Sequence, residues 1–274
     1  MSNPSKPLVS VYLPTHNRSK SLERAIQSVF NQTWKPIELI VVDDGSDDQT
    51  HDLLSKLQKS HPFRIIRNTV PAGASASRNT AIQLANGEFV AGLDDDDYWT
   101  SHRIEWMMQE FRDGLSAVCS NDKMDYGDKE IVWKKKRTIT LQDLLYYNRV
   151  GNQVLTKKEY ILGVGGYDES LPSAQDYDLW IRLVQEYGPI KNIPKTLQVV
   201  SMRENQHRIT TSAGKMEGYR ACFEKHRNKM NSLQIRYQFY RMKLASGEKV
   251  SWIELFKSVP SGLLIKEITR KLFL

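Results

Sequence analysis

The sequence has few cysteines and no long hydrophobic run. Its 274 residues include only Cys119 and Cys222, without a CxxC spacing, so neither a disulfide framework nor a cysteine zinc site is expected. No apolar run approaches the roughly 18 to 20 residues that span a bilayer. Residues 1–7 also lack the apolar stretch of a signal peptide. These absences predict a reduced, cytoplasmic protein.

Two common active-site signatures are missing as well. A dinucleotide-binding G-x-G-x-x-G does not follow the first predicted strand, where residues 14–18 are PTHNR. Residues 73–77, GASAS, approach the hydrolase pattern G-x-S-x-G, but the fifth residue is Ser77 rather than glycine. The sequence therefore favours neither a Rossmann dehydrogenase nor a serine hydrolase.

Positive charge is concentrated at the C-terminal end. Residues 215–274 contain 13 Lys and Arg against 5 Asp and Glu, whereas the rest of the chain contains 26 against 27. A neutral body argues against a nucleic-acid partner, and the basic end indicates an acidic one. Aromatic residues such as Trp252 and Phe256 alternate with the basic ones, a pattern typical of segments that lie in an anionic membrane interface. Packing against the rest of the chain, or against a second subunit in a homodimer, is the alternative.

Apolar runs alternate with helical patterns in the first hundred residues, which predicts a parallel sheet with right-handed crossovers. Strands are predicted at residues 8–13, 37–42, 63–67 and 89–93. Helices are predicted at residues 22–30, around 53–57, at 76–86 and at 101–112. Gly87 is expected to be the C′ glycine of the third helix. Further helices are expected from Asp176 and from Met216, with Gly247 and Pro260 as breakers, whereas residues 115–200 otherwise show no clear pattern.

Polar side chains follow three of the predicted strands. Thr15 to Asn17 follow the first, Asp43 and Asp44 the second, and Asp94 to Asp97 the fourth. In open α/β sheets, ligands bind outside the carboxyl ends of the strands. The sequence therefore predicts one binding crevice formed by all three clusters.

Four consecutive aspartates need a compensating group. Close pairs of like charges repel by about 4 kcal/mol at an effective dielectric of 20, and a hard divalent cation, arginines or raised pKa values relieve that repulsion. Alternate residues of an extended segment face one side, so Asp94 and Asp96 can converge on a cation. An oxygen-only site suits Mg²⁺ or Mn²⁺. The alternative is that these acids cap the helix predicted at 101–112 and face solvent.

Six segments, taken together and in order, resemble the family 2 glycosyltransferases, which have the GT-A fold. They lie at residues 9–18, 41–46, 73–79, 93–97, 165–168 and 175–180. The resemblance covers about residues 7–210. It implies a Rossmann-like, mostly parallel sheet flanked by helices, a nucleotide-sugar donor, Mn²⁺ or Mg²⁺, and inversion at the anomeric carbon. Many bacterial members of this size resemble enzymes that build O-antigen or capsule units on a lipid diphosphate.

The resemblance also assigns roles to individual residues. It implies that the nucleotide is bordered by Pro14, Thr15, Asn17 and Arg18, that Asp43 holds the base, and that Arg78 lies near the diphosphate or base. In the family's D-x-D element, Asp94 would bind the ribose and metal, Asp96 the metal, and Asp97 would extend the element. Asp176 matches the family's general base.

One position departs from the usual family pattern, and a second follows that pattern only loosely. Gln175 replaces the glutamate that commonly precedes the base, which removes a negative charge beside Asp176. His207 lies where many members have a histidine that completes the metal site, although a structural histidine is the alternative. The basic run at residues 134–137 is interpreted as a solvated surface, with contact to an acceptor diphosphate as the alternative.

The predicted organisation has three parts. Residues 1–105 form the nucleotide-sugar half, residues 106–214 the acceptor-binding and catalytic half of the same domain, and residues 215–274 a basic, amphipathic helical appendage. The predicted enzyme is a hexosyltransferase that moves a hexose or N-acetylhexosamine from a UDP-sugar to a lipid-diphosphate-linked saccharide, peripherally on the inner face of the cytoplasmic membrane. A sugar nucleotidyltransferase, or a nucleotide-sugar-binding protein without activity, is the alternative.

Overall fold

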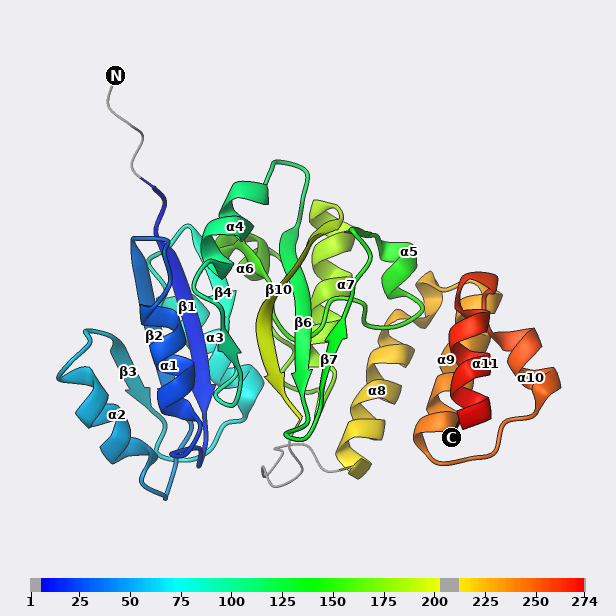
Figure 1. Ribbon diagram of the computed structural model, residues 1–274, viewed down its shortest axis with the longest axis horizontal. Coiled ribbons are helices and arrows are strands. Elements are labelled where there is room, and N and C mark those ends of the chain that lie inside the picture. Colours follow the sequence, from blue (N-terminus) through cyan, green and yellow to red (C-terminus); the bar gives the residue numbers. More distant parts are fainter. Residues whose placement is uncertain (1–5, 203–211, 274) are drawn as a thin grey trace.

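The structure, a computed structural model, describes residues 6–202 and 212–273. A mixed sheet runs through the body with the strand order β3-β2-β1-β4-β9-β6-β10-β5. Helices cover both faces of this sheet, and α9, α10 and α11 form a separate group at the end that carries the C-terminus (Figure 1). The α/β class and the helical appendage predicted from the sequence are thus present.

The N-terminal part of the sheet is parallel throughout. Its strands are β1 (Val9–Thr15), β2 (Ile37–Asp43), β3 (Arg64–Arg67) and β4 (Phe89–Gly92). The connecting helices are α1 (Leu22–Phe30), α2 (Thr50–Gln58) and α3 (Ala74–Leu84). All seven elements were predicted from the sequence, because each has a clean apolar period.

Gly87 does not have the predicted role of a C′ glycine. Helix α3 ends at Leu84, with Ala85 in an extended conformation as its C-cap. A Cβ atom on Gly87 would lie 2.7 Å from the backbone nitrogen of Ser10. Glycine is needed here because the segment before β4 passes close against β1.

The second part of the sheet was not predicted from the sequence. Strand β9 (Leu155–Lys157) runs antiparallel between β4 and β6 (Ala117–Asp125), and β6 pairs in parallel with β10 (Ile190–Ser201). Three short strands complete the sheet: β5 (Tyr98–Trp99), β7 (Glu130–Trp133) and β8 (Thr138–Ile139). A single antiparallel strand therefore joins two parallel regions.

Alternate side chains of each strand point to opposite faces of the sheet, and a separate group of helices packs on each face. Val9, Val11 and Leu13 of β1 face a cluster with α1, α2 and α4 (Arg103–Glu110), whereas Tyr12 faces a second cluster with α3 and α7 (Gln175–Tyr187). The remaining helices of the body are α5 (Leu141–Leu144), α6 (Lys158–Gly163) and α8 (Ser212–His226).

The appendage has a small core of its own. It contains α9 (Ser232–Ala245), α10 (Trp252–Ser258) and α11 (Leu264–Phe273). Helix α9 ends before Gly247, which has a φ of 78°, and α10 ends before Pro260, as predicted. Its buried side chains are Tyr237, Tyr240, Val250, Leu255, Val259 and Leu263, and they pack against Tyr146 and Tyr147 of the body.

Hydrogen bonds fasten the appendage to the body. The Gln238 side chain donates to the Leu145 carbonyl (3.1 Å) and to the Tyr177 hydroxyl (3.0 Å), which lies on α7. The appendage is therefore tied to the segment around α5 and to the helix that carries Asp176. Within residues 6–202 and 212–273, no helix combines the length and apolar character that crossing a bilayer requires.

Candidate active site

A cleft of about 760 Å³ lies beyond the carboxyl ends of β1 and β4. Both parts of the sheet and the start of α8 contribute to its walls. Eight of the residues singled out from the sequence line this one cleft: Pro14, Thr15, Arg18, Arg78, Asp94, Asp96, Asp97 and Asp176. The structure thus brings together residues that are up to 162 positions apart in the chain.

Asn17 and Asp43 do not line the cleft, although the sequence places both at the nucleotide. Asn17 adopts a left-handed conformation (φ 55°), and its Oδ1 accepts hydrogen bonds from the backbone of Asp47 and Asp48. Asp43 is fully buried and accepts a hydrogen bond from the backbone of Ser46 (3.0 Å). Both side chains therefore hold the turns behind the wall.

His16 and Asp44, the neighbours of these two residues, line the cleft instead. The carboxylate of Asp44 accepts hydrogen bonds from the backbone of Ala72 and Gly73, each at 2.8 Å, and from Asn68 (2.7 Å). Burial raises the pKa of Asp44, but these hydrogen bonds outweigh it and leave the pKa below its usual value. The sequence pattern does not predict which of Asp43 and Asp44 faces the cleft, because β2 ends at Asp43 and the regular alternation of side chains ends with it.

Asp94 is held by three side chains from α3 and from the loop before β9. Its Oδ1 accepts hydrogen bonds from Arg78 Nη2 (2.8 Å) and Gln153 Nε2 (2.8 Å), and its Oδ2 accepts one from Asn152 (2.7 Å). The Arg78 guanidinium also lies 5.3 Å from the ring centroid of Tyr167. Asn152 and Gln153 were not found from the sequence, because single amides in a loop carry no recognisable pattern.

Asp97 links the two parts of the fold. It is buried, and its carboxylate accepts hydrogen bonds from the Ser201 backbone (3.0 Å), Asn152 (2.9 Å) and Gln198 (3.2 Å). Burial and the charges of nearby aspartates raise its pKa well above the usual value. Although Asp97 reaches the cleft wall, its contacts are those of a tie between the end of β4 and β10.

The aspartate run has the donor atoms that a divalent cation needs. Asp94 and Asp96, on alternate residues, both line the cleft and are each about one-fifth exposed. Between them, Asp95 is buried with one carboxylate oxygen lacking a hydrogen-bond partner, and burial followed by the charge of Asp96 raises its pKa to about 7. This surplus of negative charge, on oxygen ligands alone, fits Mg²⁺ or Mn²⁺.

The described residues do not by themselves complete such a metal site. Within the described ranges, no three acidic, histidine or cysteine side chains gather closely enough to hold a metal ion by themselves. His207, the predicted third ligand, lies outside the described residues. Mg²⁺ is commonly bound by one or two carboxylates together with substrate phosphates and water, so a metal site of this kind needs no third protein ligand.

Asp176 faces the aspartate run from the start of α7. Its Oδ2 accepts a hydrogen bond from Asn148 Nδ2 (3.1 Å), and the residue before the helix, Ala174, is left-handed (φ 59°). Burial raises the pKa of Asp176 to about 6, although its hydrogen bonds and the charge of Arg78 oppose this. A carboxylate with this pKa is ionised at neutral pH yet is a stronger base than an ordinary aspartate.

Asp178, two residues further along α7, has a different environment. Its fully buried carboxylate contacts Arg182 Nη2 (2.6 Å), Lys225 Nζ (2.9 Å) and His226 Nε2 (2.8 Å). Burial raises its pKa, but the hydrogen bond from His226 and the positive charges outweigh it and hold the pKa far below the usual value. Asp178 therefore ties α7 to α8, a contact that no local sequence pattern predicts.

The basic run at residues 134–137 has partners within the protein. Lys135 is buried in an ion pair with Asp122 (2.6 Å) and donates to the Val150 carbonyl. Lys136 pairs with Asp143 at 2.8 Å. For Lys135, the buried ion pair replaces both the solvated surface and the diphosphate contact considered from the sequence, whereas Lys134, Lys136 and Arg137 are exposed, as a solvated surface predicts.

Comparison with known proteins agrees with this geometry. The model of the family described as "Glycosyl transferase family 2" matches residues 10–166. The Escherichia coli K12 protein WcaA, named for a glycosyl transferase role in colanic acid biosynthesis, is 31% identical over 264 residues, covering 90% of this chain and 91% of that protein. The GalNAc(5)-diNAcBac-PP-undecaprenol beta-1,3-glucosyltransferase of Campylobacter jejuni is 33% identical over 189 residues, covering 66% and 60%.

Solved structures show the same fold. Staphylococcus aureus TarS residues 1–349, in complex with UDP-GlcNAc, superposes with a TM-score of 0.69 at 20% identity, covering 91% of this chain and 78% of that one. The mannosyltransferase PcManGT of Pyrobaculum calidifontis, in complex with GDP-Man and Mn²⁺, has a TM-score of 0.62 at 17% identity, covering 98% and 82%. Because the family model spans more than half of the chain and WcaA matches nearly all of it, this protein belongs to glycosyl transferase family 2 and is a glycosyltransferase.

Proposed function

We propose that this enzyme transfers a hexose or N-acetylhexosamine from a UDP-sugar to a hydroxyl of a lipid-diphosphate-linked saccharide, with inversion, during bacterial surface polysaccharide synthesis. The observation that carries the proposal is the single cleft in which Arg78, Asp94 and Asp96 face Asp176. The names of two relatives support the biological setting, since one refers to colanic acid and the other to an undecaprenol-linked acceptor. A structural neighbour solved with UDP-GlcNAc supports the donor class.

The donor diphosphate is assigned to the wall formed by Arg18, Arg78, Asp94 and Asp96. A divalent cation held by Asp94 and Asp96 would stabilise negative charge on the leaving diphosphate. Arg78 is fixed by its ion pair with Asp94 at 2.8 Å, so its guanidinium is oriented before the donor binds. Pro14 and Thr15 line the adjoining wall, and the base contact predicted for Asp43 stays a prediction.

The acceptor hydroxyl is assigned to the opposite wall, beside Asp176. A proton moves from that hydroxyl to the Asp176 carboxylate as the oxygen attacks the anomeric carbon and the bond to the diphosphate breaks. A single displacement from the face opposite the leaving group inverts the anomeric configuration. Asn148 donates a hydrogen bond to Asp176 and so orients the carboxylate towards the cleft.

A calorimetric titration with UDP tests the donor assignment. We expect UDP to bind in the presence of Mn²⁺ and to bind much more weakly in excess EDTA. Binding that is unchanged by EDTA would remove the metal role from Asp94 and Asp96. If UDP fails to bind in either condition while GDP or dTDP binds, the uridine assignment is wrong.

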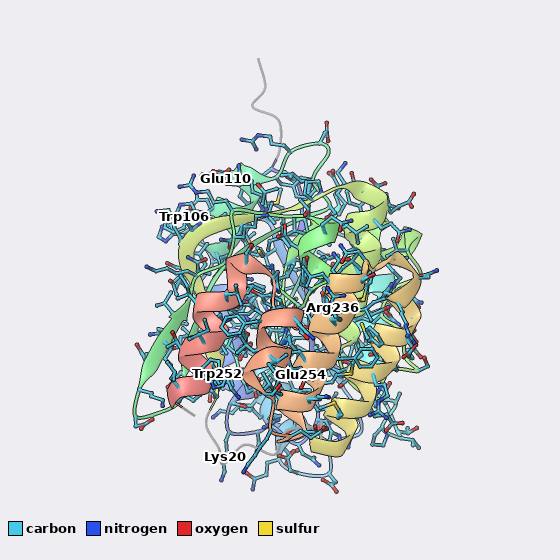
Figure 2. All side chains as sticks on the ribbon, turned by 90° about the vertical axis from the view of Figure 1, so that its right-hand side faces the viewer. Lys20, Trp106, Glu110, Arg236, Trp252 and Glu254 are labelled. Carbon is cyan, nitrogen blue, oxygen red and sulfur yellow. The ribbon has the colours of Figure 1, made fainter. Side chains whose placement is uncertain are left out.

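The outer face of the appendage is proposed to contact an anionic membrane. Helix α10 exposes Ile253 (68%) and Phe256 (57%), and α11 exposes Ile265 (82%). Trp252, also on α10, lies at the end of the molecule that faces the viewer in Figure 2. Exposed aromatic and aliphatic side chains next to a net excess of Lys and Arg suit a peripheral position on the cytoplasmic membrane surface.

Vesicle sedimentation tests this contact. The wild type should sediment with vesicles that contain phosphatidylglycerol, and the triple variant Ile253→Ser, Phe256→Ser, Ile265→Ser should remain in the supernatant. If sedimentation is unaffected, while the same substitutions convert a dimer to a monomer in analytical ultracentrifugation, the face is a subunit interface instead. Helices α10 and α11 would then serve assembly rather than the membrane.

A further inference from the structure

Three cations from three separate segments converge on the ring of Tyr147. The Arg149 guanidinium lies 4.4 Å from the ring centroid, that of Arg241 on α9 lies 4.9 Å away, and Lys266 Nζ on α11 lies 5.7 Å away. The body supplies one cation and the appendage supplies two. The cluster therefore exists only because the appendage is docked on the segment after α5.

Few negative charges compensate this cluster. Asp143 approaches Arg149 Nε only at 4.0 Å and is already paired with Lys136 at 2.8 Å. Within residues 6–202 and 212–273, no acidic side chain forms an ion pair with Arg241 or Lys266. Arg149 Nε is buried and has no hydrogen-bond partner among the described groups. The cluster is therefore net positive, and the buried Arg149 Nε without a hydrogen bond is a group that a bound anion would satisfy.

The titration of Lys266 reflects the same imbalance. Burial lowers its pKa, and the positive charges of Arg241 and Arg149 lower it further, although Glu267 opposes them. Glu267 itself is turned inward, where its carboxylate accepts hydrogen bonds from the hydroxyls of Tyr237 and Tyr240. The Glu267 carboxylate is thus hydrogen-bonded inside the appendage, and the net charge of the three-cation cluster stays positive.

The cluster lies next to the acceptor end of the cleft. Asn148, between Tyr147 and Arg149 in the chain, lines the cleft and donates to Asp176. On the other side, Ile265 precedes Lys266 and is 82% exposed. The charge of Arg241 also acts on Tyr219, a second residue of the cleft wall, so the cluster borders the cleft from α9 as well as from the segment after α5.

We propose that Arg149, Arg241 and Lys266 bind a phosphoryl group of the acceptor's lipid-linked diphosphate. This inference rests on the proposed function, and it adds the residues that recognise the acceptor. A phosphoryl group has several oxygens that accept charge-assisted hydrogen bonds at once. It can therefore bind two guanidinium groups and one ammonium group together, for which a carboxylate ligand has too few oxygens. Lys135 and Lys136 are not available for this role, because they are paired with Asp122 and Asp143.

Binding of farnesyl diphosphate, a short lipid diphosphate, tests the proposal. The titration is made with saturating UDP and Mn²⁺, so that the donor site is filled, and farnesol serves as the uncharged control. The double variant Arg241→Gln, Lys266→Gln should weaken farnesyl diphosphate binding by at least about tenfold, since each charge-assisted hydrogen bond to a phosphate contributes strongly. Arg220→Gln, Lys249→Gln removes the same charge from exposed positions and should leave binding unchanged.

A conservative variant guards against loss of folding. Lys266→Arg keeps the charge and should bind farnesyl diphosphate within about threefold of the wild type, whereas Lys266→Gln alone should bind it clearly more weakly. The acceptor site is overturned if both double variants bind farnesyl diphosphate equally while both still bind UDP. Failure of the wild type to bind UDP would instead contradict the proposed function itself.

A second arm separates the acceptor diphosphate from membrane headgroups. With phosphatidylglycerol vesicles, the two double variants should lose the same amount of binding, because they carry the same charge. If the Arg241→Gln, Lys266→Gln variant loses vesicle binding selectively and farnesyl diphosphate does not compete, the cluster recognises headgroups and the acceptor assignment is wrong.

Discussion

The two sides of the cleft are built in different ways. On the donor side, Arg18 and Asp94 lie just after β1 and β4 of the parallel sheet, and Arg78 lies in the first turns of α3, the helix between β3 and β4. On the acceptor side, Asp176 depends on Asn148 from a distant loop and on a helix fastened by α8 and α9. The donor side is encoded locally, whereas the acceptor side is assembled by contacts between remote segments.

The same contrast recurs within a single helix. Asp176 and Asp178 are two residues apart on α7 and so point to nearly opposite sides of the helix. Burial raises the pKa of Asp176 to about 6, whereas His226, Arg182 and Lys225 hold the pKa of Asp178 far below its usual value. An acid with few partners is free to accept a proton, whereas an acid held by Arg182, Lys225 and the His226 ring is fixed. On one helix, Asp176 is therefore suited to proton transfer, whereas Asp178 is suited to stabilising the fold.

Replacing Asp176 should have the largest effect on activity. Asp176→Asn removes the proton acceptor, so kcat should fall by roughly 10²- to 10⁴-fold. UDP affinity should stay within about twofold, because the donor wall is untouched, and calorimetry measures this. Turnover that is unchanged in Asp176→Asn would remove the residue from the role of general base.

Replacing Asp178 should instead affect stability. Asp178→Asn leaves Arg182, Lys225 and His226 without their buried anion and should lower the free energy of unfolding by about 3 kcal/mol. Because the pKa of Asp178 is depressed in the folded state, its stabilising contribution is present above its unfolded pKa, near 3.9, and is lost as the pH falls below that value. Urea denaturation at pH 7 and pH 3 should therefore show a smaller difference between variant and wild type at pH 3.

Arg78 tests whether the donor side acts independently. Arg78→Gln should weaken UDP binding by about tenfold, since a charge-assisted contact to the diphosphate is lost. Arg78→Lys should rescue this only in part, because an ammonium cannot reproduce the planar contact with Asp94. Equal UDP affinity in Arg78→Gln and wild type would place the diphosphate elsewhere in the cleft.

The pH profile should show a smaller effect from Gln175. The wild-type kcat/KM should rise with pH, with the midpoint of the rise at about pH 6, as Asp176 loses its proton. Gln175→Glu introduces the charge that is usual in the family and should move this rise to higher pH, because a neighbouring carboxylate disfavours ionisation. If the pH profile of Gln175→Glu moves to lower pH or does not move, a charge at position 175 does not raise the pKa of Asp176.

The sequence by itself determined the N-terminal sheet and the family. Residues 8–13, 37–42 and 89–93 alternate cleanly with helical patterns, and a parallel sheet brings their carboxyl ends to one edge, so Thr15, Arg18 and the aspartate run were predictable as neighbours. The prediction was less sharp within each cluster, because a turn at the end of a strand decides whether Asp43 or Asp44 faces the ligand.

Only the tertiary structure decided the rest. Strands β6, β9 and β10 contain polar residues and bulges that give no clean period, and they are defined by long-range pairing. Asp178 and the cations around Tyr147 likewise depend on α7, α8, α9 and α11 packing together. Local patterns encode backbone periodicity, whereas the pKa of an acid and the convergence of charges depend on which distant segments surround them.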